Sequence, residues 1–393
     1  MAVTLTNADS ALKSYYLEAV SEQLDNYVNP FLAQIKKTSD NVWGKEVKQL
    51  AIYGVNGGVG AGTEDGALPK ANGNNYVQFT SSLKNLYGNV EISDKAIRAS
   101  ENNSGAFVSL LNSEMDGLVK ASAFNLGRML FGDGTGKLAL ITDVDDGNVL
   151  TVSDITFLME GMVIDIYDDD NLPVDGATER RILYIDRAAK TVKLSGADID
   201  DEDVPEGSSF VMHGSYNNEL TGLAAIFDSN ITTLYGVNKA ENPWIKPKVA
   251  TNVGAITEGA IQTMLDALEE AGGDPANLIV TSFGVRRALI NLFATNKRVV
   301  NTVDLAGGYK ALSFNGIPIV ADRFCQKNTM YILNTKDFAL NQLCDWQWLT
   351  GDDGKVLRQV PGKPVYTATL VKYAELMCSR PYAQGVLKGI TEA

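Results

Sequence analysis

Few side chains in this sequence have the types and spacing that catalysis or metal binding requires. His213 is the only histidine, which argues against His-based catalytic triads and histidine-rich metal sites. It ends an apolar run that predicts a strand, so we expect a satisfied surface histidine there. Cys325, Cys344 and Cys378 form no CxxC pair, and they indicate neither a disulfide framework nor a zinc site. We therefore predict no catalytic residue, metal or cofactor, and we do not expect an enzyme.

Two glycine-containing stretches lack the features of phosphate-binding loops. The glycines between residues 54 and 66 fit GxGxxG in no register, and strand, glycines and helix do not follow in the required order. Gly136 and Lys137 resemble the end of a Walker A loop. However, Phe131 stands at the first glycine position and Leu138 replaces the required Ser or Thr. Neither stretch indicates a nucleotide site.

The acidic residues are concentrated in one segment. The formal net charge of the chain is −14, and residues 138–215 alone hold 18 acidic and 5 basic residues, a net charge of −13. Clusters such as Asp168–Asp170 lack the spacing of an EF-hand loop, so we expect solvated loops rather than a calcium site. Short apolar runs between turn residues predict a small β-barrel or sandwich here that folds on its own. The overall charge argues against nucleic-acid binding by the whole chain.

The longest predicted element is a helix over residues 104–131. Apolar residues recur there at steps of three and four without an intervening proline, and Gly132 and Gly134 follow as stop signals. We expect this helix to be a spine against which distant strands pack. An amphipathic helix is also predicted over residues 8–37, with a kink or an end at Pro30. It is an arm that packs on a neighbour or on the chain's own core.

Residues 43–92 predict a long β-hairpin with a glycine-dense tip. The predicted strands are Lys45–Tyr53 and Tyr76–Tyr87, and seven glycines lie between residues 54 and 73. An isolated hairpin is marginally stable in water, so this one needs a surface of its own domain or of another subunit. The residues that we expect at a subunit interface are Gly57, Gly58, Gly60, Gly62, Lys70, Val77 and Phe79.

After residue 216 the pattern is mixed α/β. Helices are predicted over 257–271 and from Ser282 to about 294. Neither a secretory signal nor a membrane span is expected, and the cysteines fit a reducing cytoplasm. Strands are predicted over residues 278–281, 317–321, 330–333, 338–343, 365–373 and 374–379.

The order of these parts resembles the major capsid protein of tailed bacteriophages, the Hong Kong 97-type fold. The resemblance covers residues 1–137 and 216–393, and the acidic segment resembles insertion domains that some members carry. The clearest local similarity lies in Tyr331–Trp348, Val365–Cys378, Arg380–Ala383 and Val386–Gly389, with Phe314–Val320 before them.

The resemblance implies an α+β fold with named parts. These are an N-terminal arm (1–42), an extended loop (43–92), a peripheral domain with the spine helix (93–137 and 330–382), an inserted acidic β-domain (138–215) and an axial domain (216–329 and 383–393). It also implies a structural function. Hexamers and pentamers would form an icosahedral shell around double-stranded DNA that is packaged without specific binding.

Further partners follow from the resemblance. A separate scaffolding protein, a portal and a decoration protein are implied, with assembly in the host cytoplasm, location in the virion and no membrane contact. The alternatives are an encapsulin-type compartment, an acidic carbohydrate-binding or adhesin protein and, least favoured, a cytoplasmic hydrolase.

Some members of this family join a lysine of the extended loop to an asparagine of a neighbour. That chemistry needs a buried carboxylate, because a lysine is protonated at neutral pH. Lys70 is the only lysine near the hairpin tip, and Asn341 is the last asparagine. Because Glu375 is far from Asn341 in sequence, we find no matching site and expect a shell without covalent links.

Overall fold

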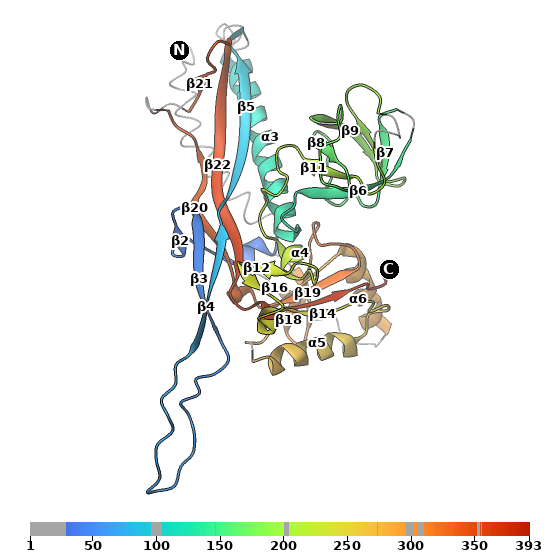
Figure 1. The fold of residues 1–393 in the computed structure, drawn as a ribbon. Helices are drawn as coiled ribbons and strands as arrows, with labels where there is room; N and C mark the ends of the chain where they lie inside the picture. The colour runs from blue at the N-terminus through green and yellow to red at the C-terminus, as the bar shows by residue number, and fades with distance from the viewer. Residues whose placement is uncertain are drawn as a thin grey trace.

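The computed structural model describes residues 29–95, 104–145, 147–199, 204–272, 274–295, 302–304, 310–351, 354 and 356–393. Its main parts are a tall five-stranded sheet, a long helix beside it, a projecting hairpin, a closed barrel and a seven-stranded sheet (Figure 1). The barrel lies to one side of the long helix, and the hairpin extends well beyond the rest of the chain (Figure 1).

The long helix α3 (Ser104–Phe131) has the bounds that the sequence predicts. Met115, Val119 and Leu130 of its apolar face are buried, and the face packs against strand β5 (Lys84–Ser93). The side chains of Phe107, Leu110 and Leu111 lie outside the described set. In its C-terminal half, where the side chains are described, the helix packs against a distant strand as predicted for a spine.

The five-stranded sheet is built around β22 (Val365–Cys378), a single strand where the sequence predicted two. Strand β5 pairs antiparallel with residues 365–374 of β22, and β20 (Phe338–Trp348) pairs with residues 370–378. Strand β1 (Lys36–Thr38) is parallel to β20, and the short β21 (Arg358–Gln359) pairs with residues 366 and 367 of β22. Since β5 pairs only with β22, it is an edge strand of the sheet, as are β1 and β21. Backbone pairing on both sides explains why β22 continues without a break.

The hairpin is shorter than predicted. Strands β3 (Glu46–Tyr53) and β4 (Asn75–Ser82) pair from Glu46–Ser82 to Tyr53–Asn75, and β2 (Val42–Trp43) adds a third strand. The predicted strand over 76–87 is in fact two strands, because the chain leaves the hairpin at Leu83 and continues as β5 in the five-stranded sheet. The alternation marks this break: the one buried residue of β4, Phe79, has an odd number, whereas the buried residues of β5 have even numbers.

The acidic segment forms the predicted barrel. The strands are β6 (Lys137–Val144), β7 (Val149–Val152), β8 (Val163–Tyr167), β9 (Arg180–Asp186), β10 (Thr191–Leu194) and β11 (Ser209–Met212), closed in the order β10-β7-β6-β11-β8-β9. It has a hydrophobic cluster of its own, centred on residues such as Leu150, Ile164 and Phe210. Phe157 and Met162 contact both this cluster and the main core.

The seven-stranded sheet carries helices α5 (Glu258–Glu270) and α6 (Phe283–Thr295). Strand β19 (Thr329–Leu333) lies in this sheet, whereas the predicted peripheral domain begins at residue 330. All five residues of β19 are buried, as expected of a central strand covered on both faces. The strand order is β14 (Lys248–Ala250), β23 (Gly385–Lys388), β19 (Thr329–Leu333), β15 (Leu278–Thr281), β18 (Ile317–Ala321), β17 (Lys310–Phe314) and β16 (Thr302–Asp304).

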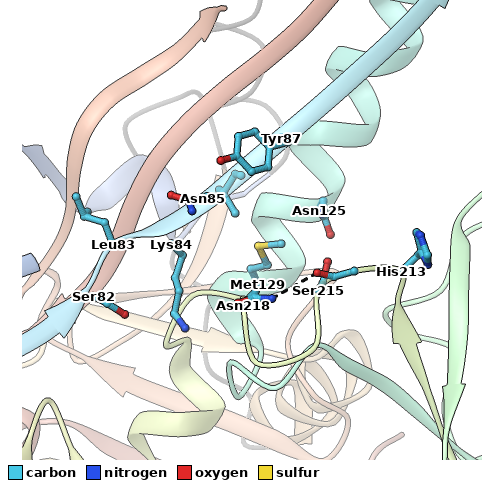
Figure 2. A pocket seen from close by; sticks show the side chains of 12 residues that line it. Ser82, Leu83, Lys84, Asn85, Tyr87, Asn125, Met129, His213, Ser215 and Asn218 are labelled. Carbon is cyan, nitrogen blue, oxygen red and sulfur yellow. Dashed lines mark hydrogen bonds between the residues drawn. The ribbon is translucent and has the colours of Figure 1, made fainter. Parts of the chain in front are cut away.

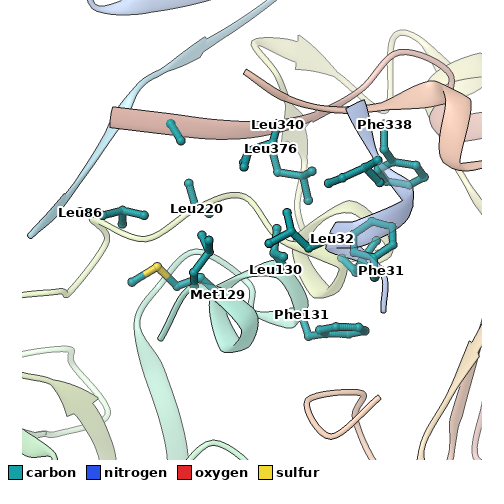
Figure 3. Packing of buried hydrophobic residues seen from close by; sticks show 14 of the residues in the cluster. Phe31, Leu32, Leu86, Met129, Leu130, Phe131, Leu220, Phe338, Leu340 and Leu376 are labelled. Atoms are coloured by element: carbon teal, nitrogen blue, oxygen red, sulfur yellow. The ribbon is translucent and has the colours of Figure 1, made fainter. Parts of the chain in front are cut away.

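Residues 8–28 of the predicted N-terminal helix lie outside the described part of the chain. No α-helix continues beyond Pro30, where an end or a kink is predicted, because the chain forms the short η1 (Leu32–Gln34) and then β1. Figure 3 shows Phe31 and Leu32 among the buried side chains at the end of α3. The Phe31 ring lies 5.4 Å from that of Phe338 and 6.1 Å from that of Phe131. This core holds the start of the described chain against the spine.

Candidate assembly surfaces

The hairpin tip lies between β3 and β4 and is mostly exposed. Of the predicted interface residues, Gly57, Gly60, Gly62 and Lys70 are exposed and Gly58 is half-buried. The tip also carries apolar side chains that the prediction missed: Val55 is 84% exposed, Val59 87% and Leu68 89%. Large apolar side chains rarely stand this free on a stable monomer surface, so the tip is a candidate interface.

Phe79 is wrongly predicted as an interface residue. Its side chain is fully buried within the chain, and its ring packs against those of Tyr235 and Trp244. Val77, on the same face of β4, is half-buried and packs against the main core. The sequence pattern identified the correct face of the strand, but the surface that covers it comes from a distant segment of the same chain.

The opposite face of the hairpin sheet is exposed and apolar. The register places Trp43 opposite Glu46 and Ile52 opposite Tyr76, so these side chains lie on one face together with Leu50. Trp43 is 68% exposed, Leu50 61%, and Ile52 and Tyr76 53% each. The sequence signal for this face was the presence of apolar residues at both odd and even positions of β3. Such a pattern predicts that both faces of the strand are buried against other surfaces.

Asn341 and Glu375 are direct neighbours, although they are far apart in sequence. They are Cα partners in the antiparallel pairing of β20 and β22, so the reason given above for expecting no cross-link is wrong. Both side chains are fully buried, and Asn41 Nδ2 donates to Asn341 Oδ1 at 3.4 Å. A lysine from another subunit cannot reach Asn341 while this packing holds. The non-covalent shell stays a prediction on this new ground.

His213 follows β11, where the sequence placed it. Its Nδ1 lies 2.8 Å from Asp165 Oδ1, and its side chain is 49% exposed. Within the part of the chain that the structure describes, no group of three or more His, Cys, Asp or Glu side chains could hold a metal ion. In the same part, no helix is long and apolar enough to cross a membrane.

A cleft lies beside the spine, where the chain leaves the barrel. It has a volume of about 430 Å³ and lies between β5, α3 and the chain that leaves the barrel. Figure 2 shows Lys84 and Tyr87 on one side, Asn125 and Met129 on the helix, and His213 near the barrel. This mixed set contains no arrangement of nucleophile, base and acid that would indicate catalysis.

A buried ion pair joins the spine to the segment that follows the barrel. The side chain of Arg128 in α3 is only 1% exposed and that of Glu219 only 2%. Both guanidinium NH groups donate to the Glu219 carboxylate, Nη1 at 2.8 Å from Oε2. Lys327 Nζ also lies 2.6 Å from Asp154 Oδ1, which ties the barrel to the loop before β19. The buried pair therefore fixes the chain just after the barrel, and the partly exposed Lys327–Asp154 pair contacts the barrel itself.

Comparisons with known proteins identify the type of fold. Residues 207–355 match the family model described as SU10 major capsid protein. None of the curated proteins matches this chain. Among solved structures, the chain is similar to the capsid asymmetric unit of cyanophage A-1(L), with 16% identity, 93% of each chain covered and a TM-score of 0.57. The matches support a major capsid protein of a tailed bacteriophage.

Two further alignments are weaker. A chain of Mycobacterium phage Bobi is 10% identical, with 94% of this chain and 92% of that chain covered and a TM-score of 0.47. The holo-SrpI encapsulin complex from Synechococcus elongatus is also 10% identical, with 95% of each chain covered and a TM-score of 0.46. Of these three likenesses, the one to the cyanophage chain shows the capsid-protein fold.

The match to the major capsid protein model covers the α/β part of the chain. Residues 207–355 run from the last barrel strand through the seven-stranded sheet to the end of β20. The spine and the hairpin lie outside this segment, and the cyanophage capsid chain covers them at the level of the fold. Together these findings support a structural capsid protein located in a phage virion.

Proposed function

We propose that many copies of this chain assemble as hexamers and pentamers into an icosahedral shell that encloses double-stranded DNA. The observation that carries the proposal is the hairpin, which projects from the body and exposes apolar side chains on its tip and on one face. Apolar surface of this extent on a projecting element favours burial against another molecule. In a closed shell, every hairpin can be buried in this way against a neighbouring copy of the same chain.

The parts of the fold take the following roles in this proposal. The β2–β3–β4 hairpin is the extended loop, and residues 1–42 are the N-terminal arm. The five-stranded sheet with α3 forms the peripheral domain, and the seven-stranded sheet with α5 and α6 forms the axial domain. The barrel is an inserted domain that projects from the shell, and its separate hydrophobic cluster supports independent folding.

Other partners belong to the same proposal. A separate scaffolding protein would guide assembly in the host cytoplasm, a portal would occupy one vertex, and a decoration protein would bind outside. The net charge of −14 suits a container that does not adhere to its DNA. The chain would then act as a structural protein without a catalytic site.

The hairpin gives the direct test. Val55→Ser, Val59→Ser and Leu68→Ser, combined in one variant, remove the exposed apolar side chains and leave the backbone length unchanged. We expect folded subunits that do not close shells, and the same from deletion of residues 57–70. The matched control replaces Thr63, Glu64 and Asp65 of the same tip by serine and should assemble normally. Normal shells from the apolar triple variant would overturn the proposed role of the tip.

The contents of purified particles separate the phage shell from an encapsulin-type compartment. Particles isolated from infected cells should contain nuclease-protected double-stranded DNA of one length. A protein cargo in place of DNA would instead assign the chain to the compartment class.

A further inference from the structure

A short segment of the chain, residues 233–245, lies between the base of the hairpin and the end of β22. It contains β12 (Thr233–Leu234), β13 (Val237–Asn238) and η3 (Pro243–Ile245). Two of its aromatic residues, Tyr235 and Trp244, contact the hairpin strands. Of the predicted interface residues, Phe79 takes part in these contacts.

Trp244 forms an aromatic stack with the hairpin. Its ring lies 4.3 Å from that of Tyr53, with an angle of 4° between the ring planes. On the next strand, the Phe79 ring lies 6.3 Å from Trp244 at 12°. Tyr53 is the last residue of β3, so the stack ends where the paired strands end and the tip begins. Such pairs stabilise the packing beyond the apolar area that they bury.

Tyr235 connects the hairpin to β22. Its carbonyl accepts a hydrogen bond from the Thr80 backbone N–H at 2.9 Å. Its hydroxyl lies 3.2 Å from the Cys378 backbone N and 3.4 Å from the Leu376 carbonyl oxygen. The side chain is 5% exposed. One residue therefore binds both the hairpin and the central strand of the five-stranded sheet.

The backbone of Tyr235 is strained. Its φ is 50°, and that of Gly236, which follows in the same turn, is 79°. Glycine adopts this left-handed region freely, whereas a bulky side chain there is unfavourable. Strain of this kind persists only where the surroundings over-determine the conformation. The contacts of Tyr235 to two separate elements supply that constraint.

We propose that residues 233–245 form a clamp that fixes the direction in which the hairpin leaves the body, with Tyr53, Phe79, Tyr235 and Trp244 as positioning residues. The clamp holds the hairpin up to Tyr53 and leaves residues 54–74 without a comparable contact within the described chain. Its consequence for assembly rests on the proposed function: a shell closes only if every hairpin points at the same site on its neighbour.

The test compares two tyrosines of the same hairpin. Tyr53→Ser removes the half-buried ring that stacks on Trp244. Tyr76→Ser, the control, removes an exposed tyrosine that stacks on no ring in the described structure. Tyr53→Phe keeps the ring and should behave as the wild type. Spin labels at the exposed Gln78 and Glu269, introduced as unnatural amino acids, report the angle between the hairpin and the α5 side of the body by double electron–electron resonance.

We expect a single narrow distance distribution in unassembled wild-type subunits, and the same in Tyr53→Phe and Tyr76→Ser. In Tyr53→Ser the distribution should broaden or move beyond the wild-type width, while amide exchange in the barrel and the seven-stranded sheet stays unchanged. An unchanged distance distribution in Tyr53→Ser would overturn the clamp. Faster amide exchange throughout that variant would also overturn it, because the substitution would then destabilise the whole subunit. If the wild type forms no shells, the proposed function fails, and the distances still decide on the clamp.

Discussion

Replacement of Glu375 by glutamine should change how subunit stability depends on pH. Burial raises the pKa of the Glu375 carboxyl from 4.5 to about 7. Its Oε1 accepts a hydrogen bond from the Thr221 backbone N–H at 2.9 Å, and its Oε2 has no hydrogen-bond partner among the described residues. A glutamine keeps the acceptor for Thr221 and cannot ionise, so it isolates the cost of charging this buried site.

The sign and the magnitude follow from the two pKa values. Because the carboxyl has a higher pKa in the folded than in the unfolded chain, the folded protein holds the proton more tightly. The resulting stabilisation is complete below pH 4.5 and is lost as the pH rises through about 7. The gap between 4.5 and about 7 corresponds to about 3 kcal/mol of unfolding free energy. Relative to the glutamine variant, the wild type should lose this amount over that range.

Urea unfolding of full-length, unassembled subunits at mildly acidic and mildly basic pH measures the effect. Glu91→Gln, the same chemical change at an exposed position of β5, is the matched control and should follow the wild type. The stability difference between Glu375→Gln and the wild type should grow in favour of the variant as the pH rises. A difference that does not change with pH would refute this account of the buried carboxyl.

Three further predictions concern the spine, the barrel and the shell. Arg128→Met should lower the unfolding free energy by about 3–5 kcal/mol because it leaves the buried Glu219 carboxylate unpaired; if Arg128→Met/Glu219→Met restores none of this loss in urea unfolding, the ion pair is not its cause. Replacement of residues 138–215 by a Gly/Ser linker should leave a soluble chain with unchanged amide exchange in β22, and insolubility would show that the barrel is part of the core. Mature particles boiled in detergent under reducing conditions should give one band at monomer mass, whereas a ladder that disappears in Lys70→Ala would show covalent links.

The sequence predicted best where one local pattern decides the structure. The bounds of α3 follow from an uninterrupted helical period and the glycines after Phe131. The barrel strands follow from short apolar runs between turn residues, although β6 was not predicted as a strand. The end of the hairpin was missed, although the side chains facing the core change from odd to even positions around Leu83.

The errors concern contacts between residues that are distant in the chain. The position of Phe79 on an apolar strand face indicates that its side chain is buried by some other surface. The sequence of the strand does not reveal that residues 233–245 of the same chain provide that surface. The register of β20 on β22 brings Asn341 beside Glu375, which sequence separation concealed. Arg128 lies between the apolar positions of α3, where a solvent-exposed side chain is expected. It is buried because the chain that leaves the barrel places Glu219 against it.

The central claim is that this chain builds a closed capsid shell. Electron microscopy of the full-length protein, purified after expression with the other head proteins from the same infection, tests the claim most directly. The account predicts closed icosahedral particles of uniform diameter in which the hairpin of each subunit lies on a neighbouring subunit. Protein that remains a soluble monomer or trimer at every concentration examined would contradict it.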